Sequence, residues 1–466
     1  MKKYFGNKAF YKTVLLISLP VMLQMGLSSF VNLLDNLMVG SLGTEAISGV
    51  AIANQMIFVY NLCIFGALSG ASIFATQFFG AKNVEGIRSC FRFKWLIGVL
   101  VFLVALLVIG LFSEPLISLF LNESEEDAGD IQLVLKLSHQ YLQIMLWGLL
   151  PFAFSQVYST SLRETKRTIL PMVSGIIAVL VNFGLNYVLI YGHLGFEAMG
   201  VKGAAIATVV SRFVELGVLV AYVHLFRIKY PFIQGIYRTL RVPWDLVKRI
   251  SLKGMPLLVN ELFWSLGMTT LFQIYSVRGL MVVTALNISS TFSNLFMVIF
   301  SSLGSATAII LGQHLGAGQL EEAKDSSRKL LFLTFLVTIV LGTCLIVTAQ
   351  YIPQFYNTSP AIRQLATQLM MVAGLFFPMY AFNMQCYFTL RAGGVTFATV
   401  LFDSVFLWVV MIPFGYSLTH WTGTSILLVY FFVQLSELIK SVIGYTMIKT
   451  GIWLKNIVAK PVEASV

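Results

Sequence analysis

The sequence predicts an all-α membrane protein in which twelve transmembrane helices form two parallel six-helix repeats around a central cavity. Three observations support this fold class. The composition is strongly apolar, twelve apolar segments are long enough to cross a bilayer, and residues of the first half of the chain recur at a constant interval in the second half.

The composition excludes an ordinary soluble domain. Hydrophobic residues make up 58% of the chain and charged residues only 11%, whereas soluble proteins carry about 25% charged residues. The net charge of +11 does not indicate a nucleic-acid partner, because Lys and Arg gather in alternate loops and at the termini, the pattern of cytoplasmic loops in membrane proteins. The four cysteines form neither a CxxC motif nor a Cys/His cluster, so neither a disulfide framework nor a zinc site is predicted.

Twelve apolar segments can span the membrane, since about 20 residues cross the roughly 30 Å hydrocarbon layer. Basic loops alternate with the acidic segment Ser113–Asp130, so both termini are predicted to be cytoplasmic. The predicted spans are 13–39, 48–76, 93–112, 133–159, 168–191, 200–226, 254–277, 283–311, 330–349, 364–388, 396–415 and 422–448.

The two halves of the chain repeat each other. A repeat of six spans returns the chain to the side on which it began, so the halves run parallel and bind cargo near their shared midplane. Residues 1–226 are predicted to form an N-lobe, 227–253 a basic cytoplasmic linker, and 254–466 a C-lobe with its tail. The pairs 236 positions apart are Pro20 and Pro256, Gly43 and Gly279, Gln77 and Gln313, and Gly80 and Gly316.

The linker 227–253 carries seven basic residues and a single acid, Asp245. Its amphipathic, basic character suits the surface of an anionic inner leaflet. A solvated tether that obeys the positive-inside rule is the alternative.

Asp35 lies near the middle of the stretch Leu19–Gly43, which is long enough to cross a bilayer. An Asp at the centre of a transmembrane helix costs on the order of 2.5–3.5 kcal/mol on insertion scales, so it rarely faces lipid and generally marks a functional site. Helical spacing places Val31, Ser28 and Gln24 on the same face, below Pro20, which can bend the helix. This polar stripe predicts a water-filled cavity beside the first span.

Other spans also carry polar residues. Asn182 and Asn186 share one face of the fifth span, where they can join helices or offer oxygens to a desolvated cation. Glu261 and Asp403 have no charged partner at helical spacing, so each either lines the cavity or is a buried acid held by a neighbouring helix. The i, i+3 pairs Arg212–Glu215 and Glu437–Lys440 are interpreted as structural neutralisation.

Enzyme signatures are absent from the sequence, which lacks HExxH, GxSxG, DDxxD and GxxxxGK[ST] motifs. The protein is therefore predicted not to be an enzyme and to need no cofactor. Any active transport by this chain alone must draw on an ion gradient.

The chain resembles the multidrug and toxic compound extrusion (MATE) family over essentially its whole length. The resemblance rests on the two six-span repeats, on Pro20 followed fifteen residues later by Asp35, on FFGAKN after the second span, on LGAGQ after the eighth, and on Leu-Arg at the ends of the fourth and tenth. It implies an antiporter that exports amphipathic, cationic organic compounds across a bacterial or archaeal cytoplasmic membrane. A lipid-linked oligosaccharide flippase of the same superfamily is the alternative, and it would require a basic cavity.

The resemblance also implies a site for the coupling ion, H⁺ or Na⁺, at Asp35, Asn182, Asn186 and Thr208. A Na⁺ ion would lie at Asp35, Asn182 and Asn186. The chain departs from the prokaryotic branch with an N-lobe site, because Asn186 replaces the second acid of the fifth span; one coupled ion is therefore expected rather than two. The other prokaryotic branch carries a Glu on the seventh span and acids on the tenth span. This chain also departs from that branch, because Glu261 comes one turn earlier than the branch's Glu and the tenth span has no acid.

The cavity wall is expected to combine flexible apolar and polar side chains, which accommodate varied cargo. For its Met and Trp residues, core packing is the alternative. The expected partners are a small organic substrate and membrane lipids, and the expected state is a monomer. The predicted cavity residues are Gln24, Met25, Met38, Met56, Glu261, Trp264 and Asp403.

Overall fold

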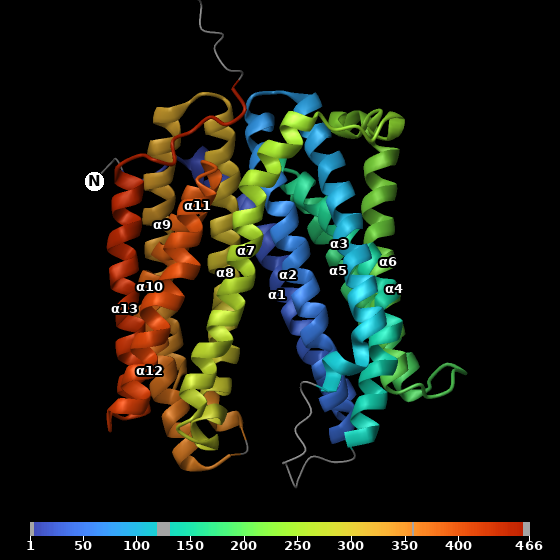
Figure 1. Cartoon of the computed structure of the whole chain (residues 1–466), viewed down its shortest axis with the longest axis vertical. Helices are drawn as coiled ribbons and strands as arrows, with labels where there is room; N and C mark the ends of the chain where they lie inside the picture. Colours follow the sequence, from blue (N-terminus) through green and yellow to red (C-terminus); the bar gives the residue numbers. More distant parts are fainter. Residues whose placement is uncertain (1–3, 119–130, 357, 460–466) are drawn as a thin grey trace, which may run out of the picture. The chain divides into compact units, whose positions relative to one another are not determined.

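The computed structural model describes residues 4–118, 131–356 and 358–459 (Figure 1). Most of the acidic segment Ser113–Asp130 therefore lies outside the described residues. The main helices are α1 (Lys8–Gly40), α2 (Thr44–Gly80), α3 (Val84–Ser118), α4 (Ile131–Glu164), α5 (Ile169–Tyr191), α6 (Val201–Leu225), α7 (Trp244–Ser276), α8 (Leu280–Gly316), α9 (Leu320–Thr348), α10 (Pro360–Ala392), α11 (Thr396–Val400), α12 (Ile412–Trp421) and α13 (Ile426–Lys449).

Short helical turns complete the architecture. Two π-helical turns, η6 (Leu401–Val405) and η7 (Leu407–Met411), join α11 to α12 into one continuous segment. Three 3₁₀ turns, η2 (Arg227–Lys229), η3 (Pro231–Ile233) and η4 (Ile236–Arg238), lie in the linker. A fourth, η5 (Ile352–Phe355), precedes α10. No strand occurs in the described parts of the chain.

Each predicted span coincides with one helical segment, and the fold class is confirmed. Within the described residues, ten segments are long and apolar enough to cross a membrane. Helices α4 and α7, at the fourth and seventh predicted spans, have the required length but carry more polar side chains. Several helices also run beyond the predicted spans, α2 for example to Gly80, because the apolar run marks only the lipid-crossing part of a helix.

The described chain forms two compact units. Unit 1 contains Met1–Met22, Thr76–Asn83 and Leu252–Val466, and unit 2 contains Leu23–Ala75 and Val84–Ser251. Helices α1, α2 and α7 each run from one unit into the other. The lobe boundaries predicted from the sequence stay a prediction.

Unit 2 is built from helix pairs around a buried charge pair. Helix α4 packs against α3 and α6, and α5 packs against α6. The Lys94 ammonium of α3 lies 2.6 Å from the Glu164 carboxylate of α4, and the Lys94 side chain is fully buried. The hydroxyls of Thr160 and Ser161 accept further hydrogen bonds from the same ammonium, so the buried charge is satisfied.

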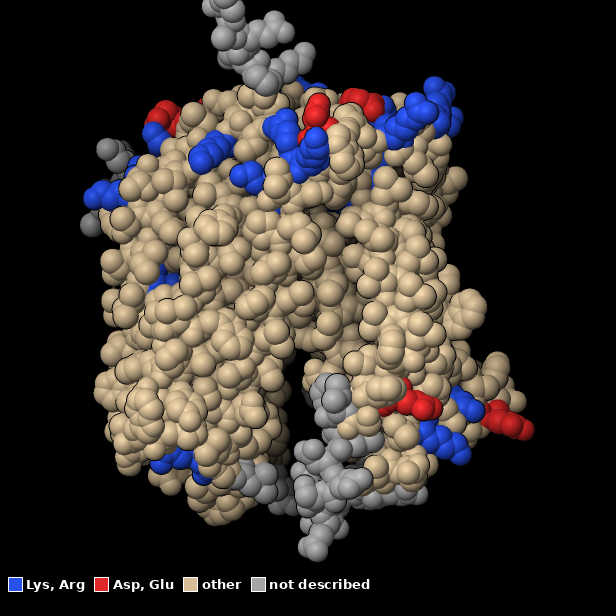
Figure 2. All heavy atoms as spheres, in the orientation of Figure 1, with Lys and Arg blue, Asp and Glu red and all other residues tan. Residues whose placement is uncertain are grey.

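The linker docks on α3. The side chains of Phe232, Ile233 and Ile236 are buried, and Arg92 donates to the Ile236 carbonyl at 3.1 Å. These three apolar residues are therefore covered by protein, whereas Ile228, Trp244 and Leu252 of the same segment are exposed. Figure 2 shows Lys and Arg gathered over the linker end of unit 2.

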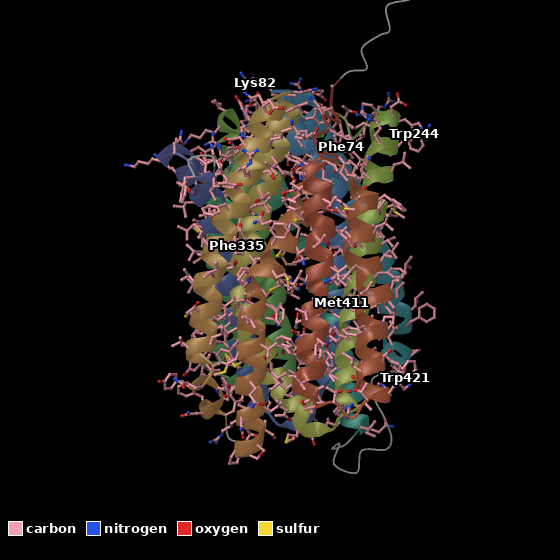
Figure 3. All side chains as sticks on the ribbon, turned by 90° about the vertical axis from the view of Figure 1, so that its left-hand side faces the viewer. Phe74, Lys82, Trp244, Phe335, Met411 and Trp421 are labelled. Carbon is pink, nitrogen blue, oxygen red and sulfur yellow. The ribbon has the colours of Figure 1, made fainter. Side chains whose placement is uncertain are left out.

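Unit 1 is centred on α10, which packs against α8, α9 and α13. Gly342 of α9 and Gly374 of α10 approach so closely that a Cβ on either would overlap the other's carbonyl oxygen. Such small-residue contacts let helices pack tightly where lipid supplies no hydrophobic driving force. Figure 3 shows Lys82 and Trp421 near opposite ends of this unit, with Phe335 and Met411 between them.

One face of α3 is suited to lipid. Large apolar side chains on it are exposed at helical spacing, and an exposed apolar stripe of this length is stable only in a hydrocarbon solvent. The residues of this stripe are Leu100, Leu103, Val104, Leu107 and Leu111.

Candidate functional site

Asp35 is held by two amides of α5. The amide nitrogen of Asn186 donates to a carboxylate oxygen of Asp35 at 2.5 Å. One turn earlier, the Asn182 amide is assigned from its hydrogen-bonding neighbours with its nitrogen toward Asp35, which places that nitrogen 3.0 and 3.2 Å from the two carboxylate oxygens. Among the described residues, no Lys or Arg forms an ion pair with Asp35. The carboxylate is thus bound by neutral donors only.

Thr208 of α6 completes this cluster. Its hydroxyl oxygen lies 3.3 Å from the side-chain oxygen of Asn182. Helices α1, α5 and α6 therefore bring together the four residues that the sequence predicts for the ion-coupling site. The side-chain oxygen of Asn186 is buried and has no hydrogen-bond partner in the described structure, so it can still accept a hydrogen bond or bind a cation.

A partly open cavity of about 450 Å³ lies beside Asp35 within unit 2. Its wall comes from α1, α2, α4 and α6 and combines polar and apolar side chains. Asp35 and Arg212 are its charged residues, and polar groups between them include Asn54, Asn61 and Tyr141. These last three residues were not predicted from the sequence, although Asn54 and Asn61 lie seven positions apart on one helical face of an apolar span, a spacing that indicates a shared polar surface.

Arg212 does not form the ion pair with Glu215 that its spacing predicts. Its guanidinium donates to the Gly148 carbonyl at 3.2 Å and lies 5.0 Å from the centre of the Phe152 ring. Glu215 interacts electrostatically with both Arg163 and Arg212, but the described ion pairs include neither contact. The guanidinium of Arg212 therefore contacts α4, and the residue also lines the cavity.

The charged residues of unit 1 form a separate network. Lys440 of α13 pairs with Asp403 at 2.7 Å, and the amide nitrogen of Asn260 donates to the same carboxylate at 3.2 Å. Glu437 accepts instead from Asn383 at 2.7 Å. Glu437 and Lys440 interact electrostatically, as their spacing predicts, but the direct ion pair of Lys440 is with Asp403. Asp403 lies in a π-helical turn, a feature frequent at functional sites.

The remaining predicted cavity residues lie in varied surroundings. Glu261 accepts from the Tyr387 hydroxyl at 3.1 Å, and Gln24 accepts from Arg163 at 2.6 Å. Trp264 packs against the apolar cluster around Leu271. Met56 is buried, Met25 is 37% exposed and Met38 is intermediate. None of the seven predicted cavity residues lines the 450 Å³ cavity of unit 2.

The repeat also appears in a comparison with known families. The MatE family model matches residues 20–188 and 256–417, two segments whose first residues are the repeat-related prolines. Together these segments cover more than half of the chain. The protein belongs to the MatE family.

MATE proteins of similar length resemble it along nearly the whole chain. The probable multidrug resistance protein NorM of Thermotoga maritima is 24% identical and covers 96% of this chain and 94% of its own. The probable multidrug resistance protein YoeA of Bacillus subtilis is 26% identical, with 90% and 89% covered.

Solved MATE structures share the fold. A multidrug resistance MATE family transporter in an outward-facing conformation superimposes with a TM-score of 0.84 at 19% identity, covering 97% of each chain. A crystal structure of a variant of the Vibrio cholerae MATE transporter VcmN gives a TM-score of 0.86 at 15% identity, covering 98% of this chain and 99% of that one. One related MATE structure is a complex with MaL6.

Membership in the MATE family confirms several predictions. The protein is a multi-pass membrane transporter and not an enzyme. MATE transporters are ion-coupled antiporters and need no organic cofactor.

Proposed function

We propose that this protein is a cation-coupled antiporter that exports amphipathic, cationic organic compounds by alternating access, with Asp35 as the coupling residue. The observation that carries the proposal is the set of contacts around Asp35. Its carboxylate borders the unit 2 cavity, and among the described residues it is bound by the amides of Asn182 and Asn186 and by no Lys or Arg. A carboxylate without a fixed cationic partner can exchange a proton or a metal cation during turnover.

Asp403 provides the contrast. Its carboxylate already lies 2.7 Å from the Lys440 ammonium. A coupling cation would therefore have to displace the positive charge of this side chain. This supports Asp35 over Asp403 as the residue that binds the coupling ion. With a single free carboxylate in the cluster, one ion per cycle is the expected stoichiometry.

Both candidate ions suit the groups present. A proton needs only the Asp35 carboxylate. A Na⁺ ion would bind that carboxylate together with the side-chain oxygens of Asn182, Asn186 and Thr208, since hard cations prefer oxygen ligands. In either case the cation cancels the charge of Asp35, which changes the affinity of the site for cationic cargo.

The energy of one ion is sufficient for useful export. One charge that moves through 100 mV supplies about 2.3 kcal/mol. Since about 1.4 kcal/mol corresponds to a tenfold ratio, a cycle that moves one net charge sustains a cargo gradient of roughly 40-fold. Exchange of one ion for a cargo with a single positive charge moves no net charge, and the concentration gradient of the ion then supplies the energy.

The charges of the unit 2 cavity favour this function over a lipid-linked oligosaccharide flippase. That alternative requires a basic cavity, whereas the unit 2 cavity is lined by one acid, Asp35, and one base, Arg212. We further infer a monomer in a bacterial or archaeal cytoplasmic membrane with both termini in the cytoplasm. The alternation of basic loops supports the orientation, and the bacterial relatives support the membrane.

Transport by the purified protein in proteoliposomes tests the proposal. Rhodamine 123, a cationic dye, is followed under an imposed proton gradient and, separately, under a Na⁺ gradient. We expect one of the two gradients to drive dye transport in the wild type and D35N to abolish it. D325N is the matched control, because Asp325 is an acid paired with Lys329 outside the site. Transport by D35N at the wild-type rate would remove Asp35 from the mechanism.

A further inference from the structure

We propose that a groove between α9, α10 and α13 of unit 1 binds an anionic phospholipid of the cytoplasmic leaflet. Its phosphate would lie at Arg328 and Lys449, and an acyl chain would lie along Phe335 and Val442. The site belongs to unit 1 and has no part in the proposed ion coupling at Asp35. The inference therefore goes beyond the proposed function and can fail without it.

Two adjoining pockets form the groove. Their volumes are about 530 and 500 Å³, and both are lined by Phe335 of α9, Phe382 of α10 and Tyr445 of α13. Helix α10 packs against both α9 and α13. Phe335 and Tyr445 are exposed, whereas Phe382 is partly buried. Helix α10 is thus the floor of the groove, and its two neighbours are the walls.

The first pocket carries the positive charges of the groove at the ends of two spans. Arg328 precedes the predicted span 330–349, and Lys449 follows the predicted span 422–448. Both line this pocket together with Lys324, and none of the described residues that line it is an acid. These charges therefore lie at the depth where lipid headgroups meet water.

Two of the three charges have no acidic partner in the described parts of the chain. Lys324 pairs with Glu321 at 2.7 Å, but neither Arg328 nor Lys449 forms an ion pair there. Both side chains are exposed, so a phosphate can reach them without breaking an existing pair. Basic pockets between transmembrane helices on the cytoplasmic side are suited to anionic headgroups.

The second pocket is suited to an acyl chain. Its lining residues are apolar except for Ser441 and the hydroxyl of Tyr445, and the Ser441 hydroxyl donates to the Glu437 carbonyl of its own helix at 3.0 Å. Val442 is 58% exposed. Phe335 lies between the two ends of unit 1 (Figure 3). An apolar groove at this depth is filled by hydrocarbon and not by water.

An anionic phospholipid uses both parts of the groove. A free phosphate would leave the apolar part unfilled, and an uncharged lipid would not use Arg328 and Lys449. A zwitterionic lipid brings its own ammonium group close to these two side chains, which opposes binding. The basic end and the apolar end together therefore select a lipid with a net negative charge.

Native mass spectrometry of the purified full chain in detergent tests the proposal. Dioleoylphosphatidylglycerol, which is anionic, and dioleoylphosphatidylcholine, which is zwitterionic with the same acyl chains, are titrated separately. The dissociation constant of the first bound lipid is measured for each. The wild type should bind the anionic lipid about tenfold more tightly, because its phosphate gains two positive charges that no acid neutralises. Glycerol 3-phosphate at the lipid concentration should not displace it.

Variants assign this preference to the groove. R328Q/K449Q should abolish the preference and leave the affinity for phosphatidylcholine unchanged, whereas V442W, which fills the apolar part, should weaken the binding of both lipids. R238Q/K248Q is the matched control. It removes one exposed Arg and one exposed Lys from the linker, and Lys248 contacts an aromatic ring of its own helix at 5.7 Å, as Lys449 does at 5.8 Å. The control should keep the wild-type preference.

Several outcomes would overturn the lipid site. Equal wild-type affinity for the two lipids would do so, and so would a preference that survives in R328Q/K449Q. An equal loss of preference in R238Q/K248Q would assign the effect to the overall charge of the protein. Unchanged lipid binding by V442W, or displacement by glycerol 3-phosphate, would show that no acyl chain occupies the groove. Each of these results leaves the antiporter proposal intact, because lipid binding is measured without a gradient.

Discussion

Gly80 lies directly against the backbone of Gln313, so closely that a Cβ on Gly80 would overlap the Gln313 carbonyl oxygen. A Cβ on Gly316 would likewise overlap the carbonyl oxygen of Gln77. The sequence repeat relates these residues, since Gly80 corresponds to Gly316 and Gln77 to Gln313. The C-terminal ends of α2 and α8 therefore meet, within unit 1, in a nearly symmetric backbone contact that requires glycine at both positions.

Gly80→Ala should lower the thermal stability of the protein. The added methyl group meets backbone atoms, which cannot move aside as a flexible side chain would, and overpacking of this kind costs about 1–3 kcal/mol. Thermal unfolding of the detergent-solubilised protein measures the effect. Gly110→Ala is the control, because a Cβ at Gly110 meets nothing within 4 Å; equal melting temperatures for the two variants would contradict the prediction.

Gln77 joins the C-terminal tail to the ends of α2 and α10. Its amide nitrogen donates to the carbonyls of Ala392 and Lys455, at 3.0 and 3.1 Å, and its oxygen accepts from the Ile457 amide at 2.8 Å. Close by, the Trp453 side chain is 1% exposed. The tail is thus part of the packed structure of unit 1.

Gln77→Ala should release this tail. The variant removes three hydrogen bonds, of which the one to the Ala392 carbonyl is buried, and loss of a buried partner costs about 1–3 kcal/mol. Limited proteolysis should cut the tail after Lys455 faster in the variant than in the wild type. Gln354→Ala, which removes only an exposed amide bonded to its own helix, should be cut at the wild-type rate.

Exchanging Asp35 and Asn186 should restore part of the coupling that D35N loses. The two side chains are in direct hydrogen-bond contact at 2.5 Å, so the double variant D35N/N186D keeps one carboxylate and one amide at the same place. Gradient-driven transport of rhodamine 123 should be higher in the double variant than in D35N alone. A double variant as inactive as D35N would show that the position of the carboxylate, and not only its presence, is essential.

Removing the carboxylate of Asp403 should destabilise the protein through Lys440. D403N leaves a buried ammonium without its acid, and breaking a buried pair in this way costs about 3–5 kcal/mol. Replacing both residues, as in D403N/K440M, should recover most of the lost stability and retain gradient-driven transport. Loss of transport in a stable double variant would instead assign Asp403 a role in the transport cycle.

The sequence by itself determined the number and positions of the membrane helices, because the length of an apolar run is set by the thickness of the bilayer and not by neighbouring helices. It also singled out Asp35, since a carboxylate within such a run is costly wherever the helix packs. The repeat that relates Gln77 to Gln313 and Gly80 to Gly316 could also be recognised in the sequence. The backbone contact between these residues could not.

Only the tertiary structure decided which side chains meet. Lys440 has an acid three residues away on its own helix, yet it pairs with Asp403, and Arg212 donates to the Gly148 carbonyl of α4 although Glu215 lies three residues away. Gln77 binds residues of the C-terminal tail, far from it along the chain. Local spacing cannot predict such contacts, because a long buried side chain binds the best partner within reach in space, and that partner is set by how the helices pack.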